Sequence, residues 1–123
     1  MVVVLKGITN DNVDVSVDLF RAVTAPLLNE FGIADVELKI KRRGAPPDGG
    51  GEVYFRCPVV RELKPINLVD MGLVKRIRGT AYSARVSPQT TTRIVDTARS
   101  ILNSTIPDVF VYSDHNRGAE SGK

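Results

Sequence analysis

The stretch that most restricts the fold of this chain is Arg43–Val53, RGAPPDGGGEV, because it joins two segments that both alternate like strands. Apolar and charged residues alternate in Val36–Arg43, and the pattern returns over Glu52–Cys57. The two prolines favour extended geometry and Gly49–Gly51 permit positive φ, so together they favour a tight connection between strands. The alternative is a cradle of backbone amides for phosphate, which also needs a helix N-terminus or oriented amides beside it. The residues alone favour the connection.

The rest of the chain adds two helices and three strands. Apolar residues at three- and four-residue steps predict the helices, while β-branched runs and alternation predict the strands. The order of elements predicts an α+β or mixed α/β fold. The expected elements are a strand over Val2–Ile8 buried on both faces, a helix over Ser16–Phe31 kinked by Pro26 and ended by Gly32, a long strand over Leu73–Val86 with a bend at Gly79, a helix that starts at Pro88 with Ser87 as its cap, and a short strand over Asp108–Tyr112.

Composition limits the class of protein. Hydrophobic residues make up 42% and charged residues 25% of the 123 residues, which argues against disorder and fits a globular domain. The single cysteine, Cys57, cannot form an internal disulfide, so a reducing compartment is the simpler location. The N-terminal run MVVVL is too short for a signal peptide or a membrane span. We therefore expect an intracellular, soluble protein with no membrane partner.

No group of residues in the chain predicts catalysis or metal binding. His115 is the only histidine, and acid–base chemistry or a metal site needs a set of partners that one histidine does not supply. Cys57 ends a strand on its apolar side and is expected to be a small buried hydrophobe. The segment Gly118–Lys123, GAESGK, has too few residues between its glycines for a phosphate loop and lacks the hydroxyl residue after the lysine. We expect no catalytic residue, no metal ligand and no cofactor.

Basic residues form two clusters, each on a predicted strand. The net charge is only +3, so the distribution of charge matters more than its total. Because neighbouring apolar residues face inward, we expect these side chains to project outward, either as solvated strand faces or as a patch that binds nucleic-acid phosphates. Tyr54 and Tyr82 are the only aromatic residues near the clusters, which gives little support for base stacking. The candidate RNA-binding residues are Lys39, Lys41, Arg42 and Arg43 in the first cluster and Lys75, Arg76 and Arg78 in the second cluster.

The segment RRGAPPDGGGEV resembles the signature of the RNA 3'-terminal phosphate cyclase family, which has a basic residue and a glycine, a proline, three glycines and an aliphatic residue. The positions that match in order are Arg43, Gly44, Pro47, Gly49, Gly50, Gly51 and Val53. Two further segments, ITNDNVDVSVD and LVKRIRGTAYSARVSPQ, are similar to the cyclase-like branch of the family more than to the true cyclases. The resemblance covers nearly the whole chain but only about a third of a family member, so we expect a central fragment.

The resemblance implies an α+β fold of repeated units, each with two helices on a four-stranded sheet, together with a smaller inserted domain. On that basis residues 1–71 form part of one repeat, with its strand, helix, strand, glycine-rich turn and strand. Residues 72–123 form the start of the insert, as strand, helix and strand. Two incomplete domains would leave unpaired strand edges and exposed apolar faces.

The resemblance also implies two alternative functions. In true cyclases ATP adenylylates a histidine late in the chain, and the RNA 3'-phosphate is then closed into a 2',3'-cyclic phosphate; no residue here matches that histidine. The cyclase-like branch lacks this activity and acts in the nucleolus, in small-subunit (40S) rRNA processing, with a large ribosome-assembly GTPase as partner. We therefore expect a nuclear, nucleolar and non-enzymatic factor of 18S rRNA processing that binds pre-ribosomal RNA and the small-subunit processing complex. The alternative is the ATP-dependent cyclase.

Overall fold

A computed structural model describes residues 1–84 and 86–116 of the chain. These residues divide into two compact units, 1–68 and 69–116, and each unit is described by itself. The division falls close to the predicted boundary after Met71, while the assignment of the two parts to a repeat and an insert stays a prediction. Within the described residues, no helix is long and apolar enough to cross a membrane.

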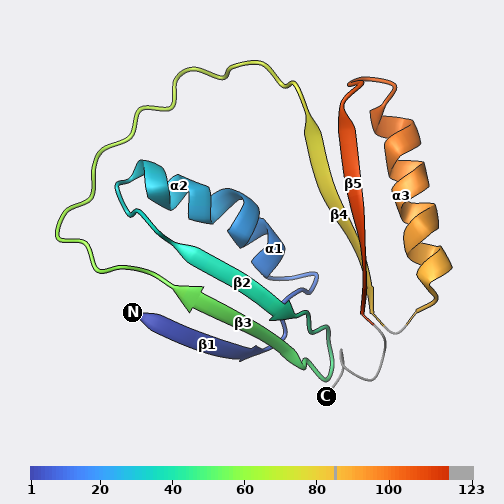
Figure 1. Ribbon diagram of the computed structural model, residues 1–123, viewed down its shortest axis with the longest axis horizontal. Helices are drawn as coiled ribbons and strands as arrows, with labels where there is room; N and C mark the ends of the chain where they lie inside the picture. The colour runs from blue at the N-terminus through green and yellow to red at the C-terminus, as the bar shows by residue number, and fades with distance from the viewer. Residues whose placement is uncertain (85, 117–123) are drawn as a thin grey trace. The chain divides into compact units, whose positions relative to one another are not determined.

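The first unit is an antiparallel sheet with helical turns packed on one face (Figure 1). Its strands lie in the order β1 (Val2–Gly7), β3 (Gly51–Arg56), β2 (Glu37–Arg42), with β3 in the centre. Between β1 and β2 the chain forms α1 (Val17–Leu19), the π-helical turn η1 (Phe20–Thr24) and α2 (Ala25–Glu30).

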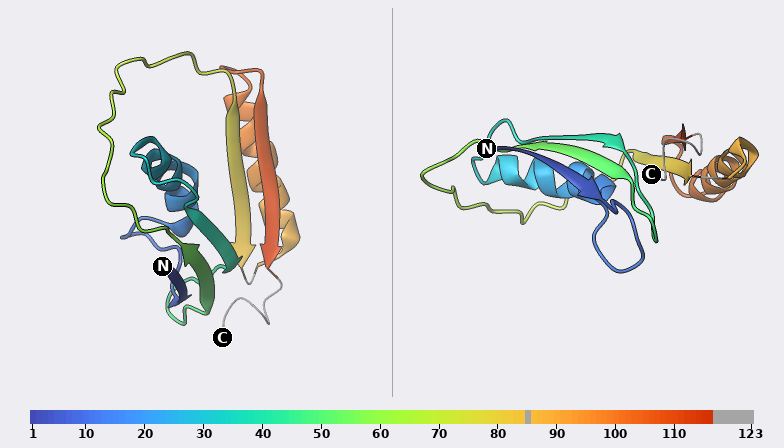
Figure 2. Two further views of the ribbon diagram at one scale, coloured as in Figure 1. Left: turned by 60° about the vertical axis from the view of Figure 1, so that its left-hand side comes forward. Right: turned by 90° about the horizontal axis from the view of Figure 1, so that it is seen from below.

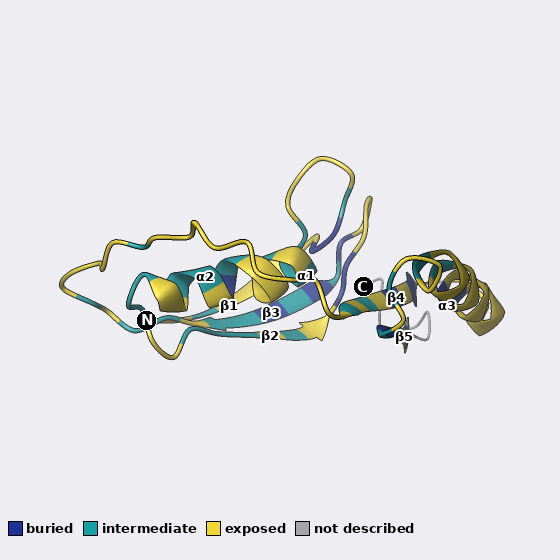
Figure 3. Cartoon of the chain, turned by 90° about the horizontal axis from the view of Figure 1, so that it is seen from above, coloured by how far each residue is buried: buried dark blue, intermediate teal, exposed yellow. Residues whose placement is uncertain are grey.

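The core of the first unit lies between the helical turns and the central strand. Val53 of β3 and Ala25 of α2 are buried. The ring of Phe20 packs edge-on against that of Phe55, with the ring centroids 6.0 Å apart. This packing joins η1 to β3 and leaves the other face of the sheet uncovered within the unit (Figure 3).

Strand β1 is present where it was predicted, but the prediction that it is buried on both faces is wrong. It pairs only with β3, and Val3 is its one half-buried residue while the others are exposed. A run of β-branched residues fits an edge strand as well as a central one, because propensity does not report how many neighbours a strand has. The central position belongs to β3, whose sequence alternates.

Helical structure forms over most of the predicted range Ser16–Phe31. Pro26 does not kink the middle of an α-helix as predicted. The chain instead widens into η1, where the N–H of Ala25 donates to the carbonyl of Phe20, and Pro26 then falls in the first turn of α2. Proline is tolerated at that position because its missing N–H has no partner there anyway. Gly32, with φ of 90°, follows the end of α2 as predicted.

The second unit is a βαβ arrangement. Ser87 caps α3 with its Oγ, which accepts from the N–H of Gln89 at 3.3 Å, and Pro88 is the first helical residue as predicted. The two strands pair in parallel, with α3 as the connection between them. The elements are β4 (Ile77–Ala84), α3 (Pro88–Leu102) and β5 (Val109–Asn116), and together with the first unit they confirm the α+β class.

The strand limits in the second unit differ from those predicted. The segment before Ile77 alternates in sequence but forms no strand, and Leu73 is exposed. In contrast, β5 continues past Tyr112 to Asn116 although those residues are polar, because each has a partner in β4 up to Ala84. Pairing with a neighbour, rather than local hydrophobicity, therefore sets both limits.

Candidate nucleic-acid interface

A bulge in β2 decides which side chains of the first cluster reach the surface. The register against β3 is regular up to Ile40 and then shifts, so that Arg42 stands opposite Glu52. An inserted residue reverses the inside–outside alternation of everything after it. Beyond the bulge, the exposed fraction of the side chain is 43% for Arg42 and only 8% for Arg43. The prediction that Arg43 projects outward is therefore wrong.

The other three cations of the first cluster are exposed and each lies beside a carboxylate. Lys39 Nζ is 2.6 Å from Glu37 Oε1, Lys41 Nζ is 2.9 Å from Glu52 Oε1, and Arg42 Nη2 is 3.7 Å from Glu52 Oε2. The hydrogen bond from Lys39 lowers the pKa of Glu37, and the one from Lys41 lowers the pKa of Glu52. Exposed ion pairs contribute little to stability, so phosphate groups can replace these carboxylates at small cost.

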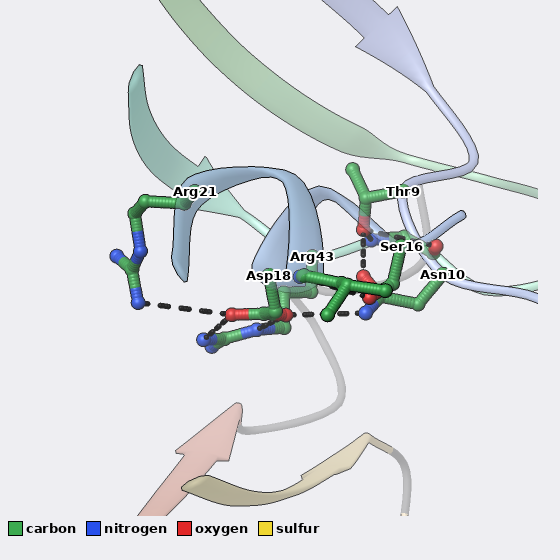
Figure 4. A network of polar contacts seen from close by, with 8 residues as sticks. Thr9, Asn10, Ser16, Asp18, Arg21 and Arg43 are labelled. Atoms are coloured by element: carbon green, nitrogen blue, oxygen red, sulfur yellow. Dashed lines mark hydrogen bonds and ion pairs between the residues drawn. The ribbon is translucent and has the colours of Figure 1, made fainter. Parts of the chain in front are cut away.

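Arg43 instead forms a bidentate ion pair with Asp18 inside the first unit (Figure 4). Its Nε donates to Asp18 Oδ2 and its Nη2 to Asp18 Oδ1, both at 2.9 Å. Two parallel charge-assisted hydrogen bonds are among the strongest side-chain contacts in proteins. They hold the pKa of Asp18 below its ordinary value, although burial of the carboxylate acts in the opposite direction. Since Asp18 belongs to α1, the pair links the end of β2 to the first helical turn.

A polar network extends from this pair to the loop after β1 (Figure 4). Asn10 Nδ2 donates to Asp18 Oδ2 at 3.1 Å, and Asn10 Oδ1 accepts from Thr9 Oγ1 at 2.6 Å. The hydroxyl of Thr9 accepts from the N–H of Gly44 at 3.0 Å, and the carbonyl of Gly44 accepts from the backbone N–H of Thr9 at 2.9 Å. Nothing local in the sequence around Thr9 and Asn10 indicates these partners, which lie 8 to 35 residues away.

Two glycines of the signature are required by close approach of the backbone. A Cβ atom on Gly44 would lie 2.3 Å from the nitrogen of Gly51 and 2.6 Å from the carbonyl oxygen of Gly7. A Cβ atom on Gly51 would lie 2.5 Å from Thr9 Cγ2 and 2.7 Å from the same oxygen of Gly7. No side chain fits at either position without a shift of the backbone. The segments that contain Gly7, Gly44 and Gly51 therefore approach one another so closely that a side chain fits at neither Gly44 nor Gly51.

The glycine-rich stretch connects β2 to β3. Ala45 and Gly49 form an isolated antiparallel bridge, and the N–H of Gly49 donates to the carbonyl of Ala45 at 3.0 Å. Gly49 and Gly50 have φ of 70° and 79°, in the left-handed region that residues with a Cβ adopt at a cost. The geometry is that of a tight connection, in which the glycines serve the chain reversal.

The second cluster lies along β4 and the residues before it. Lys75, Arg76 and Arg78 are all exposed. Arg76 Nε donates to Asp108 Oδ2 at 2.5 Å, and the guanidinium of Arg76 also lies over the ring of Phe110, 5.4 Å from its centroid. This ring comes from β5, far along the chain, and sequence reasoning did not associate it with the cluster.

The other features considered in the sequence are Cys57, His115 and Gly118–Lys123. Cys57 is half-buried rather than buried, and its thiol is free. His115 lies in β5, but its side chain is outside the described residues, as is the whole of Gly118–Lys123. Among the residues that the structure describes, no three His, Cys, Asp or Glu side chains gather as a metal site would require.

Comparison with known proteins identifies the family. The model of the RNA 3'-terminal phosphate cyclase family matches residues 1–114. The chain belongs to this family. The RNA 3'-terminal phosphate cyclase-like proteins of Bos taurus and Homo sapiens are 61% and 62% identical to it over 123 residues, and the rRNA processing protein rcl1 of Schizosaccharomyces pombe is 50% identical over 121 residues. These alignments cover 98%, 98% and 96% of this chain and 33% of each relative, so the chain spans about a third of their length.

Membership of the RNA 3'-terminal phosphate cyclase family, predicted from the signature, is thus confirmed. The signature residues of this family member have different structural roles. Arg43 and Gly44 bind the loop after β1 and the first helical turn, while Gly49 and Gly50 allow the chain to reverse. Pro47 follows Pro46 through a cis peptide bond within the same connection.

Proposed function

We propose that this chain is part of a non-enzymatic ribosome-biogenesis factor that acts in the nucleolus, in the processing of 18S rRNA for the small (40S) subunit. The observation that supports the proposal most is the 50% identity to the Schizosaccharomyces pombe rRNA processing protein rcl1. The identity of 62% to a human protein named as cyclase-like agrees with it. On this proposal the protein binds pre-ribosomal RNA and assembles with the small-subunit processing complex and a ribosome-assembly GTPase.

An ATP-dependent RNA 3'-terminal phosphate cyclase is the second candidate, because the matching family model is described by that activity. The two are separated by incubation of the full-length protein with labelled ATP and a 3'-phosphorylated RNA. We expect no covalent label on the protein and no cyclic RNA ends. Either product would contradict the non-enzymatic proposal and support the cyclase.

The proposed RNA contacts are the exposed cations. Arg43 is no longer among them, because its guanidinium is buried against Asp18. Lys39, Lys41, Arg42 and Arg76 are exposed cations paired with half-buried carboxylates, and phosphate groups can displace these carboxylates. The proposed contact residues are Lys39, Lys41 and Arg42 in the first cluster and Lys75, Arg76 and Arg78 in the second cluster.

Charge reversal tests these contacts in the full-length protein. Arg42→Glu should weaken RNA binding at low salt and reduce the slope of log K against log salt by about one, as expected for a lost phosphate contact. Arg61→Glu makes the same charge change at an exposed residue outside both clusters and serves as the control. Equal salt slopes for the two variants would assign Arg42 to a solvated strand face.

A further inference from the structure

The two-stranded sheet of the second unit has two faces of different character, and α3 covers one of them (Figure 2). On the covered face lie Ala81, Ser83 and Val109, all buried. The opposite face consists of the alternate residues of each strand, and its side chains are exposed or half-buried. We call it the open face, and its residues are Arg78, Thr80 and Tyr82 from β4 and Phe110, Tyr112 and Asp114 from β5.

The parallel register brings aromatic and basic residues of the open face together. Arg78 pairs with Phe110, and Thr80 pairs with Tyr112. The exposed fractions of Phe110 and Tyr112 are 44% and 60%. These residues stand two positions apart on β5, so their side chains leave the same face of the sheet from Cα atoms roughly 6.6 Å apart. The open face therefore presents two neighbouring rings beside an arginine.

The charges around these rings have a net value of +1, from three cations and two carboxylates. The guanidinium of Arg76 lies over the ring of Phe110, 5.4 Å from its centroid, while its Nε is hydrogen-bonded to Asp108. A guanidinium plane can itself stack on a base, so this pair of side chains lengthens the stacking surface. The charged residues at the open face and its edge are Lys75, Arg76 and Arg78 against Asp108 and Asp114.

Single-stranded RNA is the occupant that fits this chemistry. Exposed rings on one strand of a sheet, flanked by arginines, are what sheet-based RNA-binding domains use to stack bases and to hold phosphates. Aromatic side chains and arginine are also enriched at protein–protein interfaces, so the charge of the ligand decides between the two: the exposed arginines beside the rings favour a polyanion. The face thus favours a ligand with flat rings and negative charge.

We propose that the open face is a stacking platform for single-stranded RNA, in which Phe110 and Tyr112 stack on bases and Arg76 and Arg78 contact phosphates. The inference rests on the proposed function, because it names where a pre-ribosomal RNA would be bound. It adds the ring contacts, which give a preference for unpaired over double-stranded RNA.

The test measures RNA affinity of the full-length protein with two fluorescein-labelled probes, an oligouridine and a hairpin duplex with the same number of nucleotides. Tyr112→Ala should weaken binding of the oligouridine roughly five- to a hundred-fold and leave its salt slope unchanged, since a stacking contact is lost and no phosphate contact. Tyr112→Phe should bind like the wild type, and Tyr112→Leu, which keeps apolar area without a ring, should bind like Tyr112→Ala. Binding of the hairpin should change little in any of these variants.

Two controls separate this inference from the proposed function and from a structural role. Ile101→Ala removes an equally exposed apolar side chain from α3 and should leave the affinity unchanged. A wild type that binds neither probe would contradict the proposed RNA contact as a whole. If the wild type and Tyr112→Ala bind the oligouridine with the same affinity, the stacking platform is refuted while the proposed RNA contact through the exposed cations still stands. Unchanged affinity with a lowered melting temperature would show that another part of the protein covers this face.

Discussion

Replacement of Arg43 by methionine should destabilise the first unit far more than the same change at its neighbour Arg42. Arg43 makes two charge-assisted hydrogen bonds of 2.9 Å to Asp18, and the exposed fraction is 8% for its side chain and 24% for that of Asp18. Loss of one partner from a buried ion pair costs about 3–5 kcal/mol, because the other charge stays behind without its partner. Asp18 retains the hydrogen bond from Asn10 and lies 3.8 Å from Arg21, so we expect about 2–4 kcal/mol.

Arg42→Met is the matched control, with the same change of side chain one residue away. Its guanidinium is 43% exposed and 3.7 Å from Glu52, so its loss should alter the stability little. The difference in stability between the two full-length variants can be measured by amide hydrogen exchange in peptides that contain Thr9 and Asn10. A loss of about 3 kcal/mol corresponds to roughly a hundred-fold faster exchange in Arg43→Met. Equal exchange in the two variants would refute the assignment of Arg43 to the interior.

Two further predictions concern the same region. Gly44→Ala should destabilise the first unit by about 3 kcal/mol, because a Cβ atom would lie 2.3–2.6 Å from three backbone atoms. Gly79→Ala, whose Cβ atom would meet Val111 at 3.8 Å, should be tolerated, and thermal melting of the two full-length variants compares them. The pKa of Asp18 is lower in the folded state than its unfolded value, so its contribution to stability is present above the unfolded pKa and is lost as the pH falls through the folded pKa. The protection of the peptides around Asp18 against hydrogen exchange should therefore decrease as the pH falls below about 4, and it should decrease less in Asp18→Asn. Parallel curves for the two proteins would contradict a stabilising role of the Asp18 carboxylate.

Local sequence signals predicted those parts of the fold that depend on neighbouring residues. Ser87 and Pro88 mark the start of α3 because a hydroxyl acceptor and a fixed φ act within one helical turn. The glycine-rich stretch indicated a connection between strands because its residues permit positive φ where the chain reverses. These elements need no knowledge of distant partners.

Contacts between distant segments could not be predicted in this way. In the sequence, Lys39, Lys41 and Arg43 continue one alternation, and only the register against β3 reveals the bulge that turns Arg43 inward. Phe110 is near no basic residue in the sequence, yet the parallel register places it beside Arg78. The apolar character of β1 likewise gave no information on whether the strand is central or at an edge. The candidate site depends on which strands pair and in which register, and a single sequence indicates this only weakly.

The bulge in β2 has a consequence for chain length. Lys41 is the extra residue, so its removal would restore regular pairing with Arg42 still opposite Glu52 and Arg43 still directed inward. A deletion or insertion after Arg42 would instead exchange inward and outward positions, and Gly44, held by Thr9 and enclosed by backbone atoms, would no longer meet its partners. The spacing from Arg42 to Gly44 is therefore constrained as tightly as the identities of these residues. Within this short segment, a deletion or insertion should do more harm than most substitutions of its exposed side chains.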